Sequence, residues 1–206
     1  MEIPKIDMKD VDFGGAFKQF VEVLKLNKKA IESVAGNAKG GAAAAVFLVA
    51  GAVAAPLGSL IFGYKFLNVV YRPDIVHVLI QAALAVVMAV LVIFVTTLVA
   101  NKLFKGKGSF AGYFRVMGLA YGLNVVGLLS AAIPSLAPLL GLVMGVWLLV
   151  VTFFAIQIIF KLDTTNSILT IIVTIVAMVI LGAVVASLGY GAAYNTLDLS
   201  SLSVRY

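Results

Sequence analysis

The sequence predicts an all-α integral membrane protein, with a bundle of five transmembrane helices preceded by an N-terminal cytoplasmic amphipathic helix. Hydrophobic residues make up 63% of the chain and charged residues only 12%, against roughly 25% charged residues in an ordinary soluble domain. A soluble chain of 206 residues has too little core volume to bury so much apolar surface. The apolar residues also form continuous runs, whereas strands of a membrane barrel are short and alternate in polarity. Lipid is therefore the expected solvent.

The apolar runs divide the chain into three parts. We expect a cytoplasmic amphipathic segment over residues 1–40, a transmembrane domain over 41–189 and a short polar tail outside the membrane over 190–206. A helix needs about 20 mainly apolar residues to cross the hydrocarbon core. Five runs have this length, and they predict helices over residues 41–62, 75–100, 110–133, 136–160 and 167–188.

Small residues predict how the third and fourth helices pack. The turn at residues 134–138 is very short, so these helices are expected to be antiparallel neighbours. A GxxxG spacing lets two helix backbones approach closely, and each helix carries one such pair: Gly118 with Gly122, and Gly141 with Gly145. We therefore expect close packing between these two helices. Trp147 lies in the middle of the fourth helix, which predicts a packed position inside the bundle.

Lysine and arginine are distributed unevenly between the two sides of the membrane. Eight lysines lie near helix ends on the side of the N-terminal segment, against three basic residues on the other side. Positive charge is retained in the cytoplasm, so the N-terminus is expected there and the C-terminus outside. The expected location is the cell membrane, or the ER or Golgi membrane of a eukaryote. This pattern accounts for the net charge of +6 without nucleic-acid binding.

The N-terminal segment has the periodicity of an amphipathic helix. Phe13, Phe17, Phe20 and Leu24 fall on one face, opposite charged and amide side chains. A second short helix is expected after Asn27, a capping residue. Three roles are open for the apolar face, which are insertion into the membrane interface, packing under the bundle, and binding of a partner. The four apolar residues are therefore candidate partner or lipid contacts.

Ionisable residues inside membrane spans are costly and mark candidate sites. Arg115 is the only one within the predicted spans. We expect it to reach the headgroups or to pair with Asp163 on the same side, and the alternative is a lipid phosphate or substrate contact. Asn124, Gln81 and Gln157 are the intramembrane polar candidates. They are expected to form hydrogen bonds between helices, with a pore or substrate site as the alternative.

Residue types needed for catalysis or for a metal are scarce in the predicted spans. These spans hold no aspartate or glutamate, so they lack the paired groups of intramembrane proteases. The chain has no cysteine and one histidine, His77, and a metal site would need more ligands. His77 is expected to lie at an interface. We expect no enzymatic activity, no cofactor and no metal.

The second half of the chain, roughly residues 105–189, has a recognisable order of motifs. A basic connection at 105–109 leads into the stretch Phe114-Arg-Val-Met-Gly-Leu-Ala-Tyr-Gly122, then Ile133-Pro134, a helix with Gly145 and Trp147, and a last apolar helix. This order resembles the Yip domain family, the Ypt/Rab-interacting membrane proteins, as does the five-helix layout. The Asp-Leu-Tyr-Gly-Pro motif of eukaryotic members is absent, and Asn124 stands where the family often has proline. Both departures favour a bacterial or archaeal member.

The resemblance implies a membrane protein without enzymatic activity, and it links eukaryotic members to vesicle trafficking and membrane shaping. The leading hypothesis is a non-enzymatic scaffold or adaptor in membrane organisation or trafficking. Its partners would be the lipid bilayer and a membrane or cytoplasmic protein that the sequence does not name. One alternative is a small transporter or channel, as a single chain or a homo-oligomer, with Asn124, Gln81 and Arg115 lining its path. Another is a subunit of a larger membrane enzyme.

Overall fold

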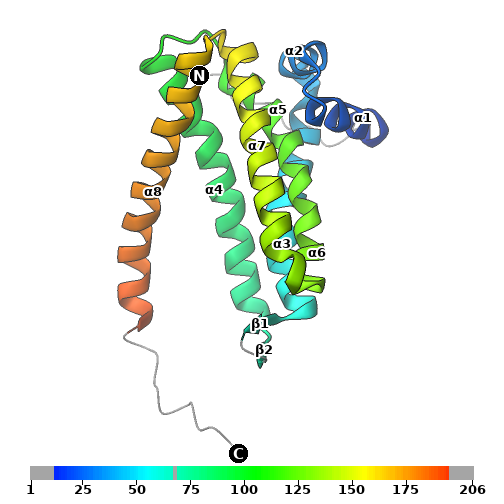
Figure 1. The fold of residues 1–206 in the computed structure, drawn as a ribbon, viewed down its shortest axis with the longest axis vertical. Helices are drawn as coiled ribbons and strands as arrows, with labels where there is room; N and C mark the ends of the chain where they lie inside the picture. Colours follow the sequence, from blue (N-terminus) through cyan, green and yellow to red (C-terminus); the bar gives the residue numbers. More distant parts are fainter. Residues whose placement is uncertain (1–11, 67–68, 195–206) are drawn as a thin grey trace, which may run out of the picture.

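The fold is known from a computed structural model, which describes residues 12–66 and 69–194 (Figure 1). Residues 1–11 and most of the predicted polar tail, residues 195–206, lie outside the described part. Helices dominate the described part, with one short antiparallel hairpin. In chain order the elements are α1 Phe13–Leu24, α2 Lys28–Gly36, η1 Ala38–Gly40, α3 Gly41–Phe62, β1 Tyr64–Phe66, β2 Val69–Tyr71, α4 Ile75–Lys102, α5 Phe110–Tyr121, η2 Gly122–Val126, α6 Gly127–Ala132, η3 Pro134–Leu136, α7 Ala137–Phe160 and α8 Thr164–Tyr194.

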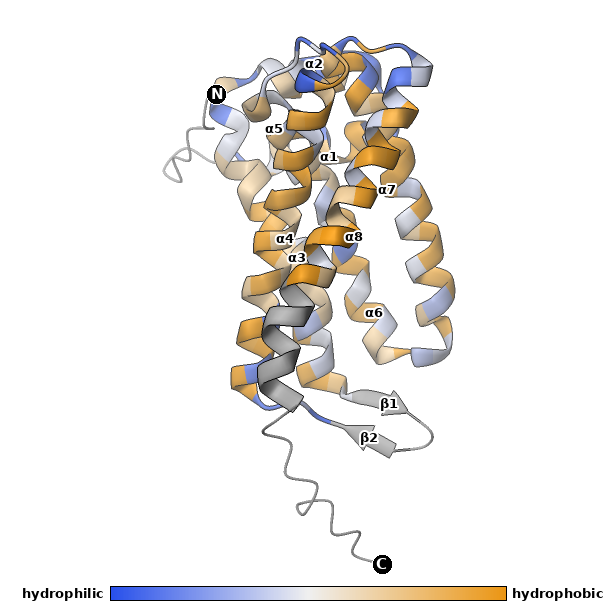
Figure 2. Ribbon diagram, turned by 90° about the vertical axis from the view of Figure 1, so that its left-hand side faces the viewer, coloured by the Kyte–Doolittle hydropathy of each residue, from blue (hydrophilic) through white to orange (hydrophobic). Residues whose placement is uncertain are grey.

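Five helical segments of the described part are long and apolar enough to cross a membrane. They run side by side (Figure 1), and hydrophobic residues cover most of their length (Figure 2). The predicted fold class, an all-α bundle of five transmembrane helices, is confirmed. The chain is a multi-pass membrane protein, and its spans are Ala38–Phe62, Ile75–Lys102, Phe110–Ala132, Pro134–Phe160 and Thr164–Val184.

The two ends of the bundle differ in charge and in structure. One end carries α1, α2, the loop from α4 to α5 and the link from α7 to α8 (Figure 1). The opposite end carries the hairpin, in which Tyr64 pairs with Tyr71. We call the first end the lysine-rich end, because it holds Lys18, Lys25, Lys28, Lys29, Lys39, Lys102, Lys105, Lys107 and Lys161.

The third span changes its helical type halfway along. The α-helix α5 ends at Tyr121, the tighter 3-10 turn η2 follows, and α6 resumes at Gly127. At this junction α3 approaches so closely that a Cβ atom on Gly51 would collide with the main-chain oxygen of Tyr121. Gly51 therefore permits a backbone-to-backbone contact that any other residue would block.

Two more glycines continue this contact between α3 and the third span. A Cβ atom on Gly118 would lie 2.7 Å from the main-chain oxygen of Ala44, and one on Gly58 would lie 2.8 Å from the Cβ atom of Ala131. Both distances are shorter than ordinary van der Waals contact. We call Gly51, Gly58 and Gly118 the glycine seam.

The expected packing of the third and fourth helices through their GxxxG pairs is wrong. Gly118 faces α3, and Gly122 faces Phe47 of α3 and Phe20 of α1. A Cβ atom on Gly141 or Gly145 would meet nothing within 4 Å. The physical reason is that α3 supplies the small facing residues that a close approach requires, whereas this part of α7 points away from its neighbours.

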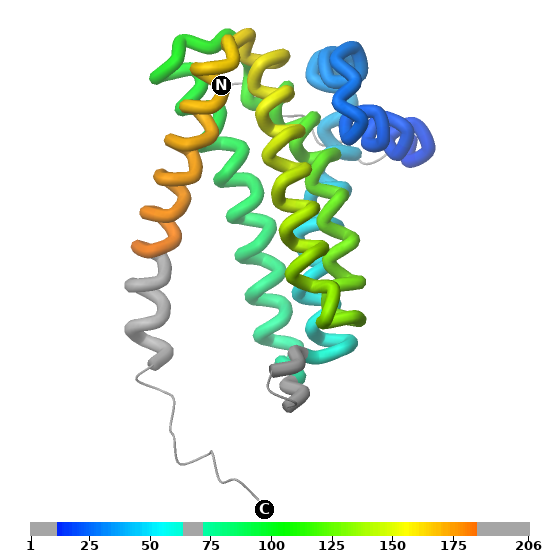
Figure 3. Tube along the Cα trace, in the orientation of Figure 1, coloured from blue at the N-terminus to red at the C-terminus, as the bar shows by residue number. Residues whose placement is uncertain are grey.

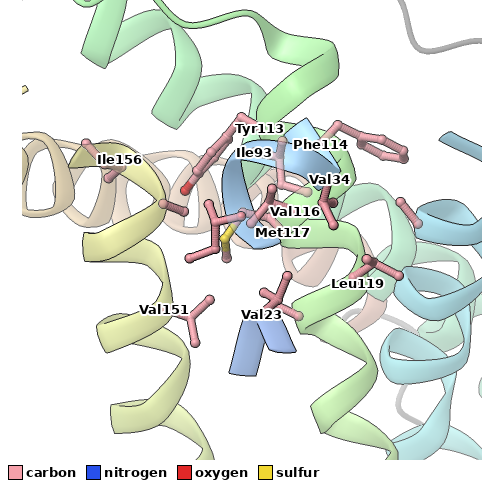
Figure 4. Close-up of a cluster of buried hydrophobic side chains, with 14 of the residues drawn as sticks. Val23, Val34, Ile93, Tyr113, Phe114, Val116, Met117, Leu119, Val151 and Ile156 are labelled. Atoms are coloured by element: carbon pink, nitrogen blue, oxygen red, sulfur yellow. The ribbon is translucent and has the colours of Figure 1, made fainter. Parts of the chain in front are cut away.

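The hydrophobic core lies in the half of the bundle next to the lysine-rich end. Every residue of α5 from Ala111 to Ala120 is buried, and Tyr113 packs edge-on against Phe160 with ring centroids 5.2 Å apart. Val23 of α1 and Val34 of α2 belong to the same cluster (Figure 4). The two N-terminal helices are thus anchored in the core that the spans form.

The last helix, α8, is packed much less densely than α5. It stands at one side of the bundle (Figure 3) and contacts mainly α4 and α7. Between residues 164 and 184 of this helix, Ser167, Thr170 and Thr174 are buried, whereas most of the large apolar residues between 168 and 180 are exposed. Lipid is the natural environment for such a surface.

Candidate functional site

The two short helices at the lysine-rich end, α1 and α2, lie outside the five spans. Helix α1 begins at the cap Asp12, whose carboxylate accepts a hydrogen bond from the Gly15 N–H at 3.0 Å. This bond satisfies one of the free N–H groups of the first turn. From there α1 projects sideways from the bundle (Figures 1 and 3).

Helix α1 has an inner edge and an outer edge. Ala16 and Val23, seven residues apart and therefore on the same edge, are 4% and 0% exposed. Phe13 and Phe17 are 55% and 58% exposed. Between the edges, Phe20 stacks obliquely on Phe17 and on Phe47 of α3, with centroid distances of 5.7 and 5.3 Å. The helix thus packs on the bundle while it displays two phenylalanine rings.

The turn from α1 to α2 is fixed by polar contacts. Glu22 accepts hydrogen bonds from the Asn27 amide at 2.8 Å and from the Lys25 ammonium at 3.1 Å. These two contacts, the Asn27 amide first, lower the pKa of the Glu22 carboxylate below its usual value. Leu26 takes a left-handed backbone conformation with φ of 61°, which reverses the chain between the helices. The direction of α2 relative to α1 is set locally.

Trp147 connects α7 to the end of α1. Its indole N–H donates a hydrogen bond of 3.2 Å to the main-chain oxygen of Leu24, one of the last four carbonyls of α1, which lack partners inside the helix. The expectation of a packed interior position for Trp147 is wrong, because its side chain is 40% exposed. The ring lies on the outer surface of α7, where α1 covers only part of it.

Arg115 connects α5 to the end of α2. Its side chain is 9% exposed, and Nη1 donates a hydrogen bond of 2.7 Å to the main-chain oxygen of Ala35. The expected pair with Asp163 is wrong: Asp163 accepts hydrogen bonds from the main chain and side chain of Asn166 instead. Contact with lipid headgroups stays a prediction for this side chain, over which α2 lies with one of its terminal carbonyls as the hydrogen-bond partner.

An apolar groove runs between α1 and the spans beneath it. It has a volume of about 490 Å³, and its ten lining residues are all apolar, three from α1, three from α3 and four from η2. Phe17 and Phe20 form the α1 side, and Phe47 and Ala50 form the α3 side. At Gly122 a Cβ atom would lie 2.6 Å from the Phe47 ring, so this glycine brings the ring onto the backbone of η2. We call this cavity the apolar groove.

A second groove lies between α2 and the end of α7, with a volume of about 690 Å³. Lys28 and Lys161 line it together with Glu32 and Asp163. Two cations and two anions leave no net charge in the lining. Simple attraction of a phosphate or of a metal ion is therefore not favoured there.

The intramembrane amides lie apart from one another. Gln157 donates a hydrogen bond of 3.1 Å to the hydroxyl of Thr164, which joins α7 to α8. Gln81 is exposed on α4. Asn124 lies in η2 next to Gly51. With Arg115 held against α2, the described residues do not bring Asn124, Gln81 and Arg115 onto one path.

His77 lies at the opposite end of the bundle. Its Nδ1 atom is 2.8 Å from a carboxylate oxygen of Asp74, the cap of α4. Within the described part of the chain, no three histidine, aspartate or glutamate side chains gather as metal ligands would.

Sequence reasoning missed the apolar groove and the hydrogen-bond partners of Arg115 and Trp147, the two side chains that hold the N-terminal helices. The groove depends on the small residues Ala50 and Gly122, which a hydropathy pattern does not distinguish from other apolar residues. For Trp147 a signal existed, since an indole N–H within an apolar span is removed from water and needs a hydrogen-bond partner, and the end of a helix offers carbonyls. Its partner is 123 residues away in the chain, and sequence alone does not locate it.

Comparison with known families gives one match. The family model of the Yip1 domain matches residues 21–186, which includes the end of α1, all of α2 and the five spans up to α8. This family is a non-catalytic membrane family whose members interact with Rab proteins. No curated protein and no solved structure matches the chain significantly.

Proposed function

The chain belongs to the Yip1 domain family, and from this membership we propose that it is a non-enzymatic scaffold or adaptor in membrane organisation. Its contact surface is the outer edge of α1. The observation that carries this proposal is the division of α1 into an edge anchored in the core and an edge with two exposed phenylalanine rings. Large exposed apolar side chains next to polar ones are typical of interaction sites.

The anchoring makes this surface suitable for recognition. A contact residue on a free tail loses much conformational entropy on binding, whereas one on a packed helix loses less. Val23 in the core, the Trp147 bond to Leu24 and the Glu22 contacts all hold α1 in place. Phe13 is therefore displayed on a preorganised support.

Crosslinking from α1 in native membranes tests the proposal. A photoreactive phenylalanine analogue at Phe13 is expected to give discrete adducts with another protein. The same analogue at Leu142, an exposed residue of α7, is the matched control and is expected to give lipid adducts alone. The same adducts from both positions, or no protein adduct from Phe13, would contradict the proposal. Point replacement is preferable to deleting residues 1–38, because deletion also removes Val23 from the core.

We also propose that the lysine-rich end faces the cytoplasm, because positive charge is retained on that side of a membrane. The chain has no cysteine, so single cysteines can report the side directly. With a membrane-impermeant maleimide and intact cells, Arg72→Cys is expected to react, and Lys105→Cys only after permeabilisation. The reverse order would mean the opposite orientation.

A further inference from the structure

The apolar groove lies at the depth of the membrane spans. Its α3 side is formed by residues such as Phe47 and Ala50, in the second and third turns of α3. Its η2 side belongs to the third span. Helix α1 covers the groove from the lysine-rich end. The cavity therefore reaches from beneath α1 to the middle of the third span, which places it within the hydrocarbon core.

The lining of the groove selects the chemistry of its occupant. None of the ten lining residues has a polar side chain, so water or a polar ligand would find no side-chain partner there. An empty groove would leave the rings of Phe17 and Phe20 without contacts on one side. A volume of about 490 Å³ is in the usual range of about 300–1,000 Å³ for small-ligand sites. In a membrane span, the apolar chains available to fill such a groove are the acyl chains of lipids.

The charge of the lysine-rich end selects the lipid headgroup. The described part of the lysine-rich end carries nine lysines but only four acidic residues, Asp12, Glu22, Glu32 and Asp163. An anionic headgroup gains from such an excess of positive charge, and a zwitterionic one gains less. We propose that the apolar groove holds one acyl chain of an anionic phospholipid, and that α1 closes over this chain. The inference goes beyond the scaffold function and does not depend on it.

A photoactivatable phosphatidylglycerol with a diazirine in its acyl chain tests the position of the lipid. In phosphatidylcholine nanodiscs doped with this probe, the full chain is expected to be labelled in segments 17–24, 46–50 and 122–126 more strongly than at Leu142 on α7. Ala50→Phe fills the groove and is expected to reduce this labelling by about fivefold or more. Val49→Phe, next to it on α3 but not in the groove lining, is the matched control. Equal labelling of groove and α7, unchanged by Ala50→Phe, would overturn the proposal.

A second measurement uses the native chain and does not require a variant to fold. Trp147 is the only tryptophan, and its bond to Leu24 places it next to a residue of the groove lining. Brominated phosphatidylglycerol is expected to quench its fluorescence at a concentration about fivefold lower than brominated phosphatidylcholine. Equal quenching by both lipids would overturn the preference for an anionic headgroup. The proposed protein contact is measured at Phe13, which does not line the groove, so failure of one proposal is distinguishable from failure of the other.

Discussion

The third and fourth spans carry the same small-residue motif and use it in opposite ways. Gly118 on α5 lies against the backbone of α3, whereas Gly141 and Gly145 on α7 have open space where their side chains would be. In an apolar stretch of 18 residues within each span, 50% of the residues are buried in the third span and 17% in the fourth span. The difference shows that a glycine pair brings two helices together only where the facing helix also has small residues at the contact. α3 meets this condition through Ala44 and Gly51.

This contrast divides the molecule into a densely packed centre and an outer layer exposed to lipid. The centre is α3 with the third span, and α1 and α2 join it through Val23 and Val34. The outer layer is α8 with the outward face of α7. In a bilayer no hydrophobic force drives outer helices against the centre, so close packing and hydrogen bonds must hold them. Variants in the two regions should therefore differ in their effects on stability.

The largest effect is expected at the glycine seam. Gly51→Val places a branched side chain against the main-chain oxygen of Tyr121, and neither backbone has room to move. We expect a loss of about 3 kcal/mol or more in the free energy of unfolding, at the upper end of overpacking effects. Thermal unfolding in detergent, followed by Trp147 fluorescence, measures it.

The control for this variant is the same change in the outer layer. Gly141→Val adds a side chain where no atom lies within 4 Å, so we expect the stability to change by less than about 0.5 kcal/mol. Equal losses for the two variants would remove the distinction between centre and outer layer.

The contrast also explains how much of the fold was predictable. Five membrane helices follow from hydropathy, which is a property of each segment alone, and this prediction is confirmed. The partners of the helices depend on pairs of distant residues. Nothing in the sequence near Gly118 indicates that it meets Ala44 rather than the fourth helix, and the periodicity of α1 does not reveal that Ala16 and Val23, not the phenylalanines, face the core.

The sequence indicated which residue types belong to the candidate site, but it did not indicate which partners these residues contact. Arg115 was recognised because a charge inside a span needs a partner. The partner that sequence reasoning favoured was a carboxylate, Asp163, whereas the structure supplies the carbonyl of Ala35 at the end of α2. Terminal carbonyls of a helix become visible as partners only when the position of that helix is known.

The next largest effect on stability is expected for a change at Arg115. This variant tests whether α2 is part of the packed centre. Arg115→Met removes the donor to the Ala35 oxygen and leaves a carbonyl near the core without its partner. The expected loss is about 1–3 kcal/mol in the free energy of unfolding. Arg115→Lys, which keeps a charged donor, is expected to lose less. A fully stable Arg115→Met would mean that Ile31 and Val34 alone hold α2.

A smaller effect is expected at Trp147, the point where the outer face of α7 touches another element. Trp147→Phe removes the hydrogen bond to the Leu24 oxygen and keeps an aromatic ring, for a loss of about 0.5–1.5 kcal/mol. Hydrogen exchange of the amides of residues 13–24 is expected to become faster, because α1 detaches more often. Leu149→Ala, a change at another exposed residue of α7, should leave this exchange unchanged. Faster exchange in both variants would mean that α7 holds α1 through general packing rather than through the indole.

The smallest effect is expected at the opposite end, where α4 is held by a local cap instead of tertiary packing. Among the first six residues of α4 only Val78 is buried. Asp74 accepts hydrogen bonds from the main-chain N–H of His77 at 3.0 Å and from its ring at 2.8 Å. These contacts, the main-chain bond first, lower the pKa of the Asp74 carboxylate below its usual value of 3.8.

A lowered pKa fixes the direction of the pH dependence. The cap contributes fully above pH 3.8, the ordinary value, and its contribution is lost as the pH falls through the lower pKa of the folded state. The NMR signal of the His77 amide should therefore titrate with a midpoint below 3.8. In Asp74→Asn this titration should vanish while the cap persists, since asparagine is an equally good N-cap. A wild-type midpoint at or above 3.8 would show that the cap bonds are absent in solution and that the start of α4 lacks this local anchor.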